Sequence, residues 1–231
     1  MARVLLIRHG QASFGAAQYD CLSPRGEQQA HWLGQCLARD FAGTVPHALW
    51  QGDMQRHRQT AAGLLAGYGT ALPLYTDAGW NEFDHQAVLR AHEPRYADPA
   101  QLAQDLATQA QPREAFTQIF RAALQRWIRG EGDYPESWRA FQQRAQAALQ
   151  RVLASGGPGD THWVVTSGGV ISVLAQSILE CSDDGALRIN WTLANAGFSL
   201  IQARANGERF LVSLNEQGHF RGAQAHLLSL R

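Results

Sequence analysis

Four short polar segments could carry chemistry, because each follows an apolar run typical of a buried strand. In chain order these segments are Arg8-His9-Gly10, Gln51-Gly52-Asp53, Trp80–His85 and Ser167-Gly168-Gly169. Histidine acts as a nucleophile or base near neutral pH, glutamate transfers protons, and arginine binds anions through parallel N–H donors. A Ser-Gly-Gly turn that opens a helix also leaves backbone amides free for an anion.

Each segment also has an ordinary structural interpretation. An Arg-His pair after a strand is often a solvated loop, and Arg56-His57-Arg58 on a helix is often a polar face. Glu82 could cap a helix or form an ion pair. Ser167-Gly168-Gly169 could serve only as a strand-to-helix turn. None of the four segments identifies a function alone.

The pattern of strands and helices indicates how these segments could meet. Apolar runs predict strands at 4–7, 47–50, 72–75 and 162–166. Helices are predicted after Ser23, after a cap at Asp53 and over 170–179. A hairpin is predicted from strands at 197–203 and 209–214 around Asn206-Gly207. Residues 86–150 show no strand pattern and predict a helical insertion. We therefore expect one domain over residues 1–231, a three-layer α/β/α fold with a mostly parallel sheet and a C-terminal hairpin. Sites in such sheets lie at the carboxyl ends of the strands.

Composition excludes several functions. All 20 basic residues are arginine, which excludes Schiff-base and pyridoxal phosphate enzymes and lysine-dependent phosphate loops. The formal net charge of zero argues against a broad nucleic-acid-binding face. The cysteines form no CxxC pair, the histidines show no metal-ligand spacing, and no segment has the ~20 apolar residues of a membrane span. We expect a protein of the reducing cytoplasm with no disulfide, metal, cofactor, nucleic-acid partner or membrane partner.

The ordered motifs resemble those of the histidine phosphatase superfamily, also called phosphoglycerate mutase-like proteins. The similar segments, which span most of the chain, are Leu5–Gln11 (strand and RHG), Leu22–Ala30 (LT-x-x-G-x-x-QA), Gly52–Ala61 (S-x-L-x-R-A-x-Q-T-A), Asn81–Asp84 (R-E-x-D) and Trp163–Ile171 (V-x-V-S-H-G-G-V-I). The resemblance implies a nucleophile at His9 and a proton donor at Glu82. The phosphate-binding residues that it implies are Arg8, Arg56, Ser167 and Gly168.

Two departures from the family pattern bear on activity. Ser167 stands where the family has a histidine that contacts the phosphoryl group, and Gly15 stands where mutases often have asparagine. A serine can still donate a hydrogen bond but cannot carry positive charge. We therefore expect a slower phosphatase, or a site that borrows a neighbouring imidazole, with His85 the first candidate and His57 the second. The alternative for both histidines is an exposed polar side chain.

The function that the resemblance implies is a phosphoric monoester hydrolase of the histidine acid phosphatase type, acting on a small phosphorylated metabolite. A phosphomutase is the enzymatic alternative, and a low-activity pseudoenzyme that binds phosphorylated ligands is the non-enzymatic one. Survival of both His9 and Glu82 argues against the pseudoenzyme, because a binding module needs neither. The helical insertion is expected to form the pocket beyond the phosphate. Its arginines could bind a second anionic group or merely solvate a helix; they are Arg90, Arg95, Arg113 and Arg121. The resemblance also leaves a homodimer open.

Overall fold

The computed structural model of the protein describes residues 1–13, 20–40 and 45–230, and the chain divides into two compact units. The first unit comprises Met1–Glu82 and Ala145–Arg231, and the second comprises Phe83–Arg144. Gly15, the position of the mutase asparagine, lies outside the described residues. In the described part of the chain, no helix is long and apolar enough to cross a membrane.

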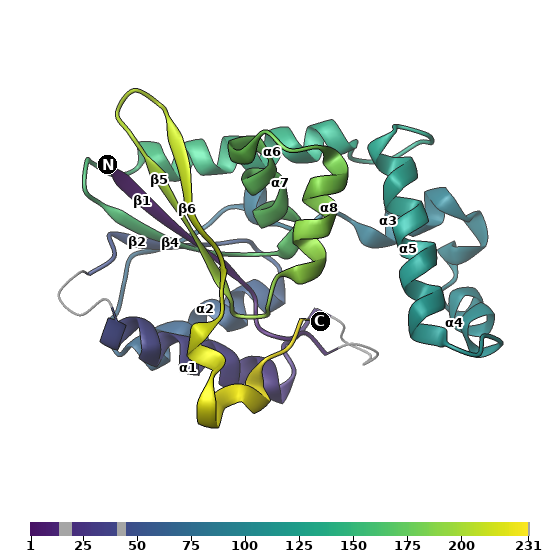
Figure 1. Cartoon of the computed structure of the whole chain (residues 1–231), viewed down its shortest axis with the longest axis horizontal. Helices are drawn as coiled ribbons and strands as arrows, with labels where there is room; N and C mark the ends of the chain where they lie inside the picture. The colour runs from purple at the N-terminus through teal and green to yellow at the C-terminus, as the bar shows by residue number, and fades with distance from the viewer. Residues whose placement is uncertain (14–19, 41–44, 231) are drawn as a thin grey trace. The chain divides into compact units, whose positions relative to one another are not determined.

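A six-stranded sheet forms the centre of the first unit (Figure 1). Its strands are β1 (Ala2–Arg8), β2 (Ala48–Gln51), β3 (Leu74–Thr76), β4 (Thr161–Thr166), β5 (Phe198–Ala203) and β6 (Arg209–Glu216), in the order β3-β2-β4-β1-β5-β6. Strands β1 to β4 run parallel to one another, whereas β5 is antiparallel to β1 and β6 is antiparallel to β5. This arrangement confirms the predicted mixed α/β fold with its C-terminal hairpin.

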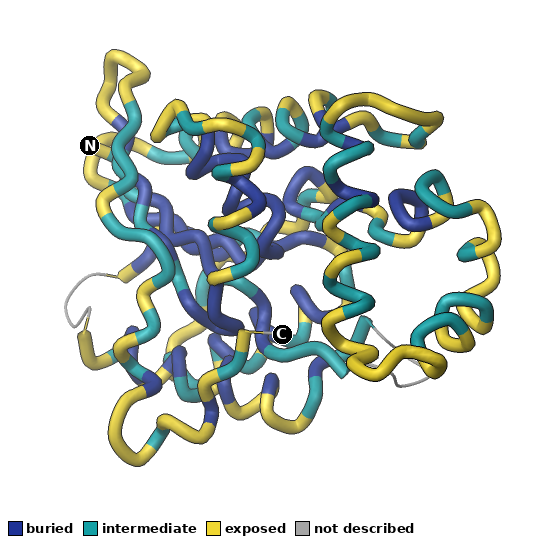
Figure 2. The backbone as a smooth tube through the Cα atoms, turned by 45° about the vertical axis from the view of Figure 1, so that its right-hand side comes forward, coloured by how far each residue is buried: buried dark blue, intermediate teal, exposed yellow. Residues whose placement is uncertain are grey.

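The two central strands, β1 and β4, are buried on both faces because each has an apolar middle, Val4–Ile7 and Trp163–Val165. In β1 and β4, Leu6 pairs with Val164, and both side chains are almost fully buried. Helices α1 (Pro24–Asp40) and α2 (Gln55–Tyr68) cover one face of the sheet, and α7 (Gly168–Leu179) covers the other (Figure 1). The buried stretch of backbone follows these central strands (Figure 2).

Local sequence signals explain where several elements begin and turn. Ser23 accepts a hydrogen bond from the amide of Gly26 at 3.1 Å, so α1 begins with the predicted serine cap. Gly207 has φ +87°, the left-handed conformation that the Asn-Gly hairpin turn requires. Helix α8 (Asp183–Thr192), with Ser182 as its N-cap, was not predicted from the sequence.

The second unit is helical. It holds α3 (His85–His92), α4 (Pro99–Ala107), α5 (Pro112–Ile128) and the first turns of α6 (Trp138–Ala154). Its core is aromatic: Trp127 lies 4.8 Å from Phe83 and 5.1 Å from Trp138, measured between ring centroids. Arg95, one of the arginines considered for substrate binding, pairs with Asp105 at 3.1 Å inside this unit.

Candidate active site

The polar residues that follow β1 and β4 are neighbours because these two parallel strands are adjacent. Arg8 pairs in register with Thr166, and the amide of His9 donates to the carbonyl of Thr166 at 2.9 Å. The residues after the two strands, His9 and Ser167, therefore lie at the same carboxyl edge of the sheet. This is the edge where α/β proteins place their sites.

His9 is held in one tautomer. Its Nδ1 lies 2.7 Å from the carbonyl oxygen of Gly10, and because a carbonyl only accepts, Nδ1 carries the hydrogen. Nε2 then has a free lone pair, as a nucleophile needs. His9 as a whole is only 8% exposed. Burial first, then the cations Arg56 and Arg8, hold the pKa of His9 well below its ordinary value of 6.5, so the imidazole is neutral at physiological pH.

The loop after His9 is fixed by close packing against α1 and α2. A Cβ atom on Gly10 would lie 2.4 Å from the carbonyl oxygen of Gly26, so only glycine fits. The amide of Gly10 donates to the hydroxyl of Thr60 at 3.0 Å, and that hydroxyl donates to the carbonyl of Arg56 at 2.7 Å. Thr60 thereby ties the His9 loop to the turn of α2 that carries Arg56.

Arg56 is a buried cation near the start of α2. It is 6% exposed and donates through Nη1 to Asp20 at 2.5 Å, while its buried Nε has no partner among the described residues. The second oxygen of Asp20 accepts from the amide of Gln55 at 2.8 Å. Asp20 was not identified from the sequence, because it lies 36 residues from Arg56 and belongs to none of the motifs.

The predicted cap at Asp53 is wrong. The N-cap of α2 is Met54, which makes no side-chain cap hydrogen bond. The carboxylate of Asp53 instead accepts from the side-chain amide of Asn81 at 2.5 Å, and Asn81 accepts from the Asp53 amide at 2.9 Å. A contact between distant loops therefore overrides the local capping preference, and it anchors the residue beside Glu82.

Glu82 lies at the N-terminus of α7. Its Oε2 accepts from the amide of Gly169 at 3.0 Å, at the helix end that stabilises negative charge. The hydroxyl of Thr166 donates to the carbonyl of Trp80 at 2.6 Å, which fixes the Glu82 loop to the end of β4. These bonds bring the predicted acid to the turn that contains Ser167.

Arg8 lies beside the same turn. Its Nη1 donates to the carbonyls of Leu193 and, at 2.8 Å, Leu230. A Cβ atom on Gly168 would lie 2.4 Å from Oδ1 of Asn190 and 3.5 Å from Nε of Arg8. Gly168 therefore permits close packing next to the arginine.

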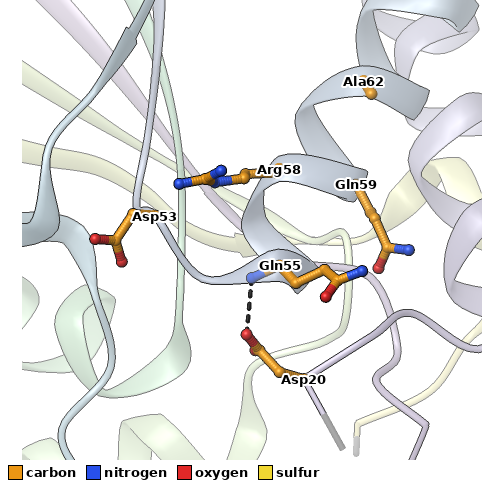
Figure 3. A pocket seen from close by; sticks show the side chains of 6 residues that line it. All are labelled: Asp20, Asp53, Gln55, Arg58, Gln59 and Ala62. Atoms are coloured by element: carbon orange, nitrogen blue, oxygen red, sulfur yellow. Dashed lines mark hydrogen bonds between the residues drawn. The ribbon is translucent and has the colours of Figure 1, made fainter. Parts of the chain in front are cut away.

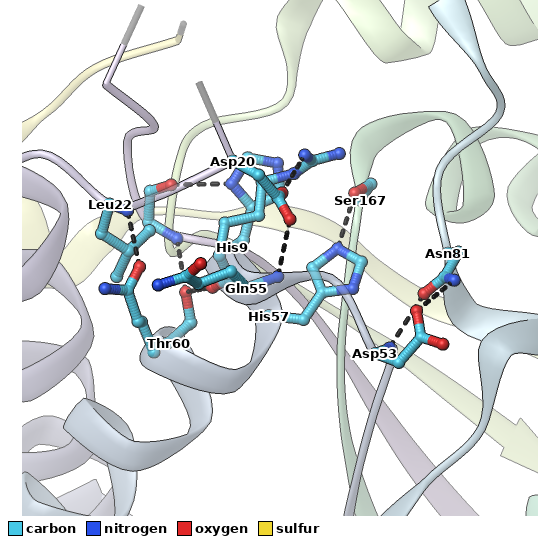
Figure 4. Close-up of polar contacts among 12 residues, drawn as sticks. His9, Asp20, Leu22, Asp53, Gln55, His57, Thr60, Asn81 and Ser167 are labelled. Carbon is cyan, nitrogen blue, oxygen red and sulfur yellow. Dashed lines mark hydrogen bonds and ion pairs between the residues drawn. The ribbon is translucent and has the colours of Figure 1, made fainter. Parts of the chain in front are cut away.

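Ser167 contacts an imidazole, and that imidazole belongs to His57. The Oγ of Ser167 lies 2.7 Å from Nε2 of His57, and both residues are fully buried (Figure 4). The alternative of an exposed His57 is therefore wrong, and the imidazole beside Ser167 is that of the second candidate. The His57 ring lies 5.7 Å from the His9 ring, and burial followed by Arg56 holds the pKa of His57 well below 6.5. His85, the first candidate from sequence, opens α3 in the second unit.

A shallow hollow of about 580 Å³ adjoins Asp20 (Figure 3). The residues that line it are Asp20, Asp53, Gln55, Arg58, Gln59 and Ala62. Its charged lining offers both carboxylates and a guanidinium to a polar molecule. Among the described residues, no cluster of histidine, cysteine and acidic side chains could hold a metal ion.

Comparison with known proteins identifies the family of the chain. The model of the histidine phosphatase superfamily (branch 1) matches residues 4–114 and 104–217. The chain belongs to the histidine phosphatase superfamily. The sequence matches none of the curated proteins compared with it.

Several solved structures share the fold of this superfamily member, and phosphatases are among them. YhfR of Bacillus stearothermophilus has a TM-score of 0.68 at 18% identity, covering 96% of this chain and 100% of that chain. A phosphoserine phosphatase mutant from Entamoeba histolytica, in complex with phosphoserine, has a TM-score of 0.63 at 18% identity, covering 96% and 100%. The mycobacterial glucosyl-3-phosphoglycerate phosphatase has a TM-score of 0.64 at 21% identity, covering 93% and 99%. At these identities the similarity shows a shared fold.

Proposed function

We propose that the protein is a phosphomonoesterase that works through a phosphohistidine at His9 and acts on a small phosphorylated metabolite. One observation carries the proposal: a buried, neutral imidazole with a fixed tautomer lies close enough to Arg56 and Arg8 for both cations to lower its pKa. A site that only bound phosphate would not need a free Nε2 lone pair. Membership of the superfamily and the phosphatases that share the fold support the same reaction.

The first step transfers the phosphoryl group. Nε2 of His9 attacks phosphorus, the P–O bond to the alcohol breaks, and Glu82 gives its proton to the leaving oxygen. Arg8 and Arg56 stabilise the charge on the equatorial oxygens through planar N–H donors. To do so, Arg56 must exchange Asp20 for the phosphoryl group; its Nε, which has no partner in the described part of the chain, can donate as well.

The second step returns the enzyme to its starting state. Glu82, now a carboxylate, takes a proton from water as the water oxygen attacks the phosphohistidine, and the P–N bond breaks. The products are the alcohol and inorganic phosphate, and no external oxidant, reductant or metal enters the balance. The amide of Gly169 holds the Glu82 carboxylate in place.

Hydrolysis of p-nitrophenyl phosphate and of a panel of phosphorylated metabolites tests the proposal. We expect His9→Ala to lower kcat by at least about 10³-fold, since the nucleophile is lost. His31→Ala, which removes an exposed histidine from α1, is the matched control and should keep wild-type activity. Acid-labile phosphate trapped on His9 during turnover would support the intermediate. Equal, near-background rates for the wild type and His9→Ala would refute the enzyme in favour of a binding module.

The metabolite panel also separates hydrolysis from mutase activity. A hydrolase releases inorganic phosphate in step with the alcohol. A mutase instead gives an isomeric phosphate ester, and this product would replace the proposed function. Phosphoserine and phosphorylated glycerate derivatives belong in the panel, because phosphatases with this fold are named for such compounds.

A further inference from the structure

Three departures from the family motifs converge on one contact. Gly52, His57 and Ser167 stand where the motif patterns have serine, alanine and histidine. In the fold, His57 contacts Ser167 at 2.7 Å. A Cβ atom on Gly52 would lie 2.2 Å from Nδ1 of His57, so the imidazole fits only because residue 52 is glycine. The histidine missing at position 167 is thus matched by a histidine gained at position 57.

The contact uses a side chain that normally has another role. Ser167 is the N-cap of α7, where serine usually accepts from a helix amide. Here it makes no cap hydrogen bond, and its hydroxyl faces His57 instead. The amide of Gly169 in the first turn of α7 goes to Glu82. The turn is therefore arranged around the His57 contact rather than around its own cap.

The donors and acceptors available to His57 determine which residue donates in its hydrogen bond with Ser167. Nδ1 of His57 is buried and has no partner among the described residues. A buried N–H without an acceptor is rarer than an unused lone pair, so the single ring hydrogen belongs on Nε2. Nε2 then donates to Oγ of Ser167. The hydroxyl hydrogen of Ser167 is left to point away from His57.

We propose that His57 and Ser167 form a two-residue hydrogen-bond donor that replaces the motif histidine. His57 is a positioning residue: it donates to Ser167, and Ser167 donates its hydroxyl hydrogen to the phosphoryl oxygen. This inference rests on the proposed phosphatase function. Ser167 is fully buried, so neighbouring atoms must move before its hydroxyl contacts a substrate.

A reciprocal exchange tests the unit directly. A histidine at position 167 has no room while His57 lies 2.7 Å from the present hydroxyl, so the two imidazoles exclude each other. We expect His57→Ala alone and Ser167→His alone each to lower kcat/KM for p-nitrophenyl phosphate by about 10- to 100-fold. The double variant His57→Ala/Ser167→His should recover to within about threefold of wild type, because coupled residues act non-additively. Additive losses in the double variant would overturn the proposal.

Two further variants separate hydrogen bonding from packing. His57→Gln keeps an N–H donor near the position of Nε2, whereas His57→Phe keeps the ring volume and has no donor. We expect kcat of the glutamine variant to stay within about fivefold of wild type and kcat of the phenylalanine variant to fall at least about tenfold. Thermal unfolding checks that both fold. Equal activity of the two variants would assign His57 to packing and overturn its positioning role.

A readout independent of turnover separates failure of this proposal from failure of the proposed function. Ring nitrogen chemical shifts of His57 should report the Nε2–H tautomer, and calorimetry with inorganic phosphate should show at least about fivefold weaker binding to His57→Phe. The Nδ1–H tautomer or unchanged phosphate binding would overturn the two-residue donor even in an active phosphatase. If instead the wild type turns over no faster than His9→Ala, the catalytic function fails while the tautomer and phosphate binding still decide the donor.

Discussion

Asp20 accepts a 2.5 Å hydrogen bond from Arg56, and its other carboxylate oxygen accepts from the amide of Gln55. A buried guanidinium and an amide at a helix N-terminus are the donors that a phosphoryl group would use. On the proposed function, this carboxylate would therefore compete with the phosphoryl group of the substrate for Arg56. It also stabilises the start of α2, whose own N-cap residue makes no side-chain hydrogen bond.

Asp20→Asn should strengthen substrate binding. Removing the negative charge frees Arg56, so we expect KM for p-nitrophenyl phosphate to fall about three- to tenfold with kcat little changed. The loss of the helix-end contact should lower the free energy of unfolding by about 1 kcal/mol. Steady-state kinetics and urea denaturation measure the two effects, and Asp40→Asn, which removes an exposed surface pair, is the control. An unchanged or higher KM would show that Asp20 does not compete.

Glu82→Gln should slow hydrolysis in a way that depends on the leaving group. The side-chain oxygen of glutamine can still accept the hydrogen bond from the amide of Gly169, but glutamine cannot supply a proton. We expect kcat to fall about 10²- to 10⁴-fold for an alkyl phosphate, whose alkoxide leaves badly without protonation. The fall for the first step with p-nitrophenyl phosphate should be smaller, because p-nitrophenolate leaves unprotonated. Single-turnover rates compare the two substrates, and equal losses would remove Glu82 from the role of proton donor.

The imidazole of His9 should stay neutral at pH values below the ordinary histidine pKa of 6.5. Burial, then Arg56 and Arg8, lower its pKa well below 6.5, so the nucleophile remains competent as pH falls through 6.5. An NMR titration of the His9 ring between pH 7.5 and 5 measures this without interference from ionisation of the substrate. A midpoint at or above pH 6.5 would contradict the buried, cation-flanked site.

The free energy of unfolding should fall in mild acid. Histidines in the unfolded chain take up protons near pH 6.5. In the folded chain the buried His9, His57 and His162 and the half-buried His219 have lowered pKa values, so they take up protons only at lower pH. Stability is therefore greatest above pH 6.5 and decreases below it. Burial lowers the pKa of His219 to about 4. His219 therefore accounts for about 2 kcal/mol of the decrease in the free energy of unfolding at pH 5. Urea denaturation at pH 7.5 and 5 should show a smaller decrease for His219→Gln than for the wild type. An equal decrease in both proteins would exclude His219 as a source.

The sequence predicts the elements better than it predicts the contacts between them. Strands β1 and β4 are recognisable because each contains a short continuous apolar run, and the hairpin is recognisable because Asn206-Gly207 favours its turn. The contact of Asp20 with Arg56 was not predicted, and His57 was only the second candidate for the imidazole beside Ser167, because the partners are 36 and 110 residues apart. A signal for His57 was nevertheless present. The motif that holds Arg56 gains a histidine while the last motif loses one.

Gly52→Ala should disturb the contact between His57 and Ser167 without changing either residue. The added methyl group would lie 2.2 Å from Nδ1 of His57 and 2.6 Å from Oδ1 of Asn81, so one or both side chains must move. We expect a loss of about 1–3 kcal/mol in the free energy of unfolding, together with a fall in kcat as His57 shifts from Ser167. Gly218→Ala is the matched control, because a Cβ atom there meets nothing within 4 Å. Adding His57→Ala to Gly52→Ala should restore part of the stability by removing the nearer clash, but not the activity. If Gly52→Ala is as stable and active as Gly218→Ala, then the glycine is not what admits the imidazole.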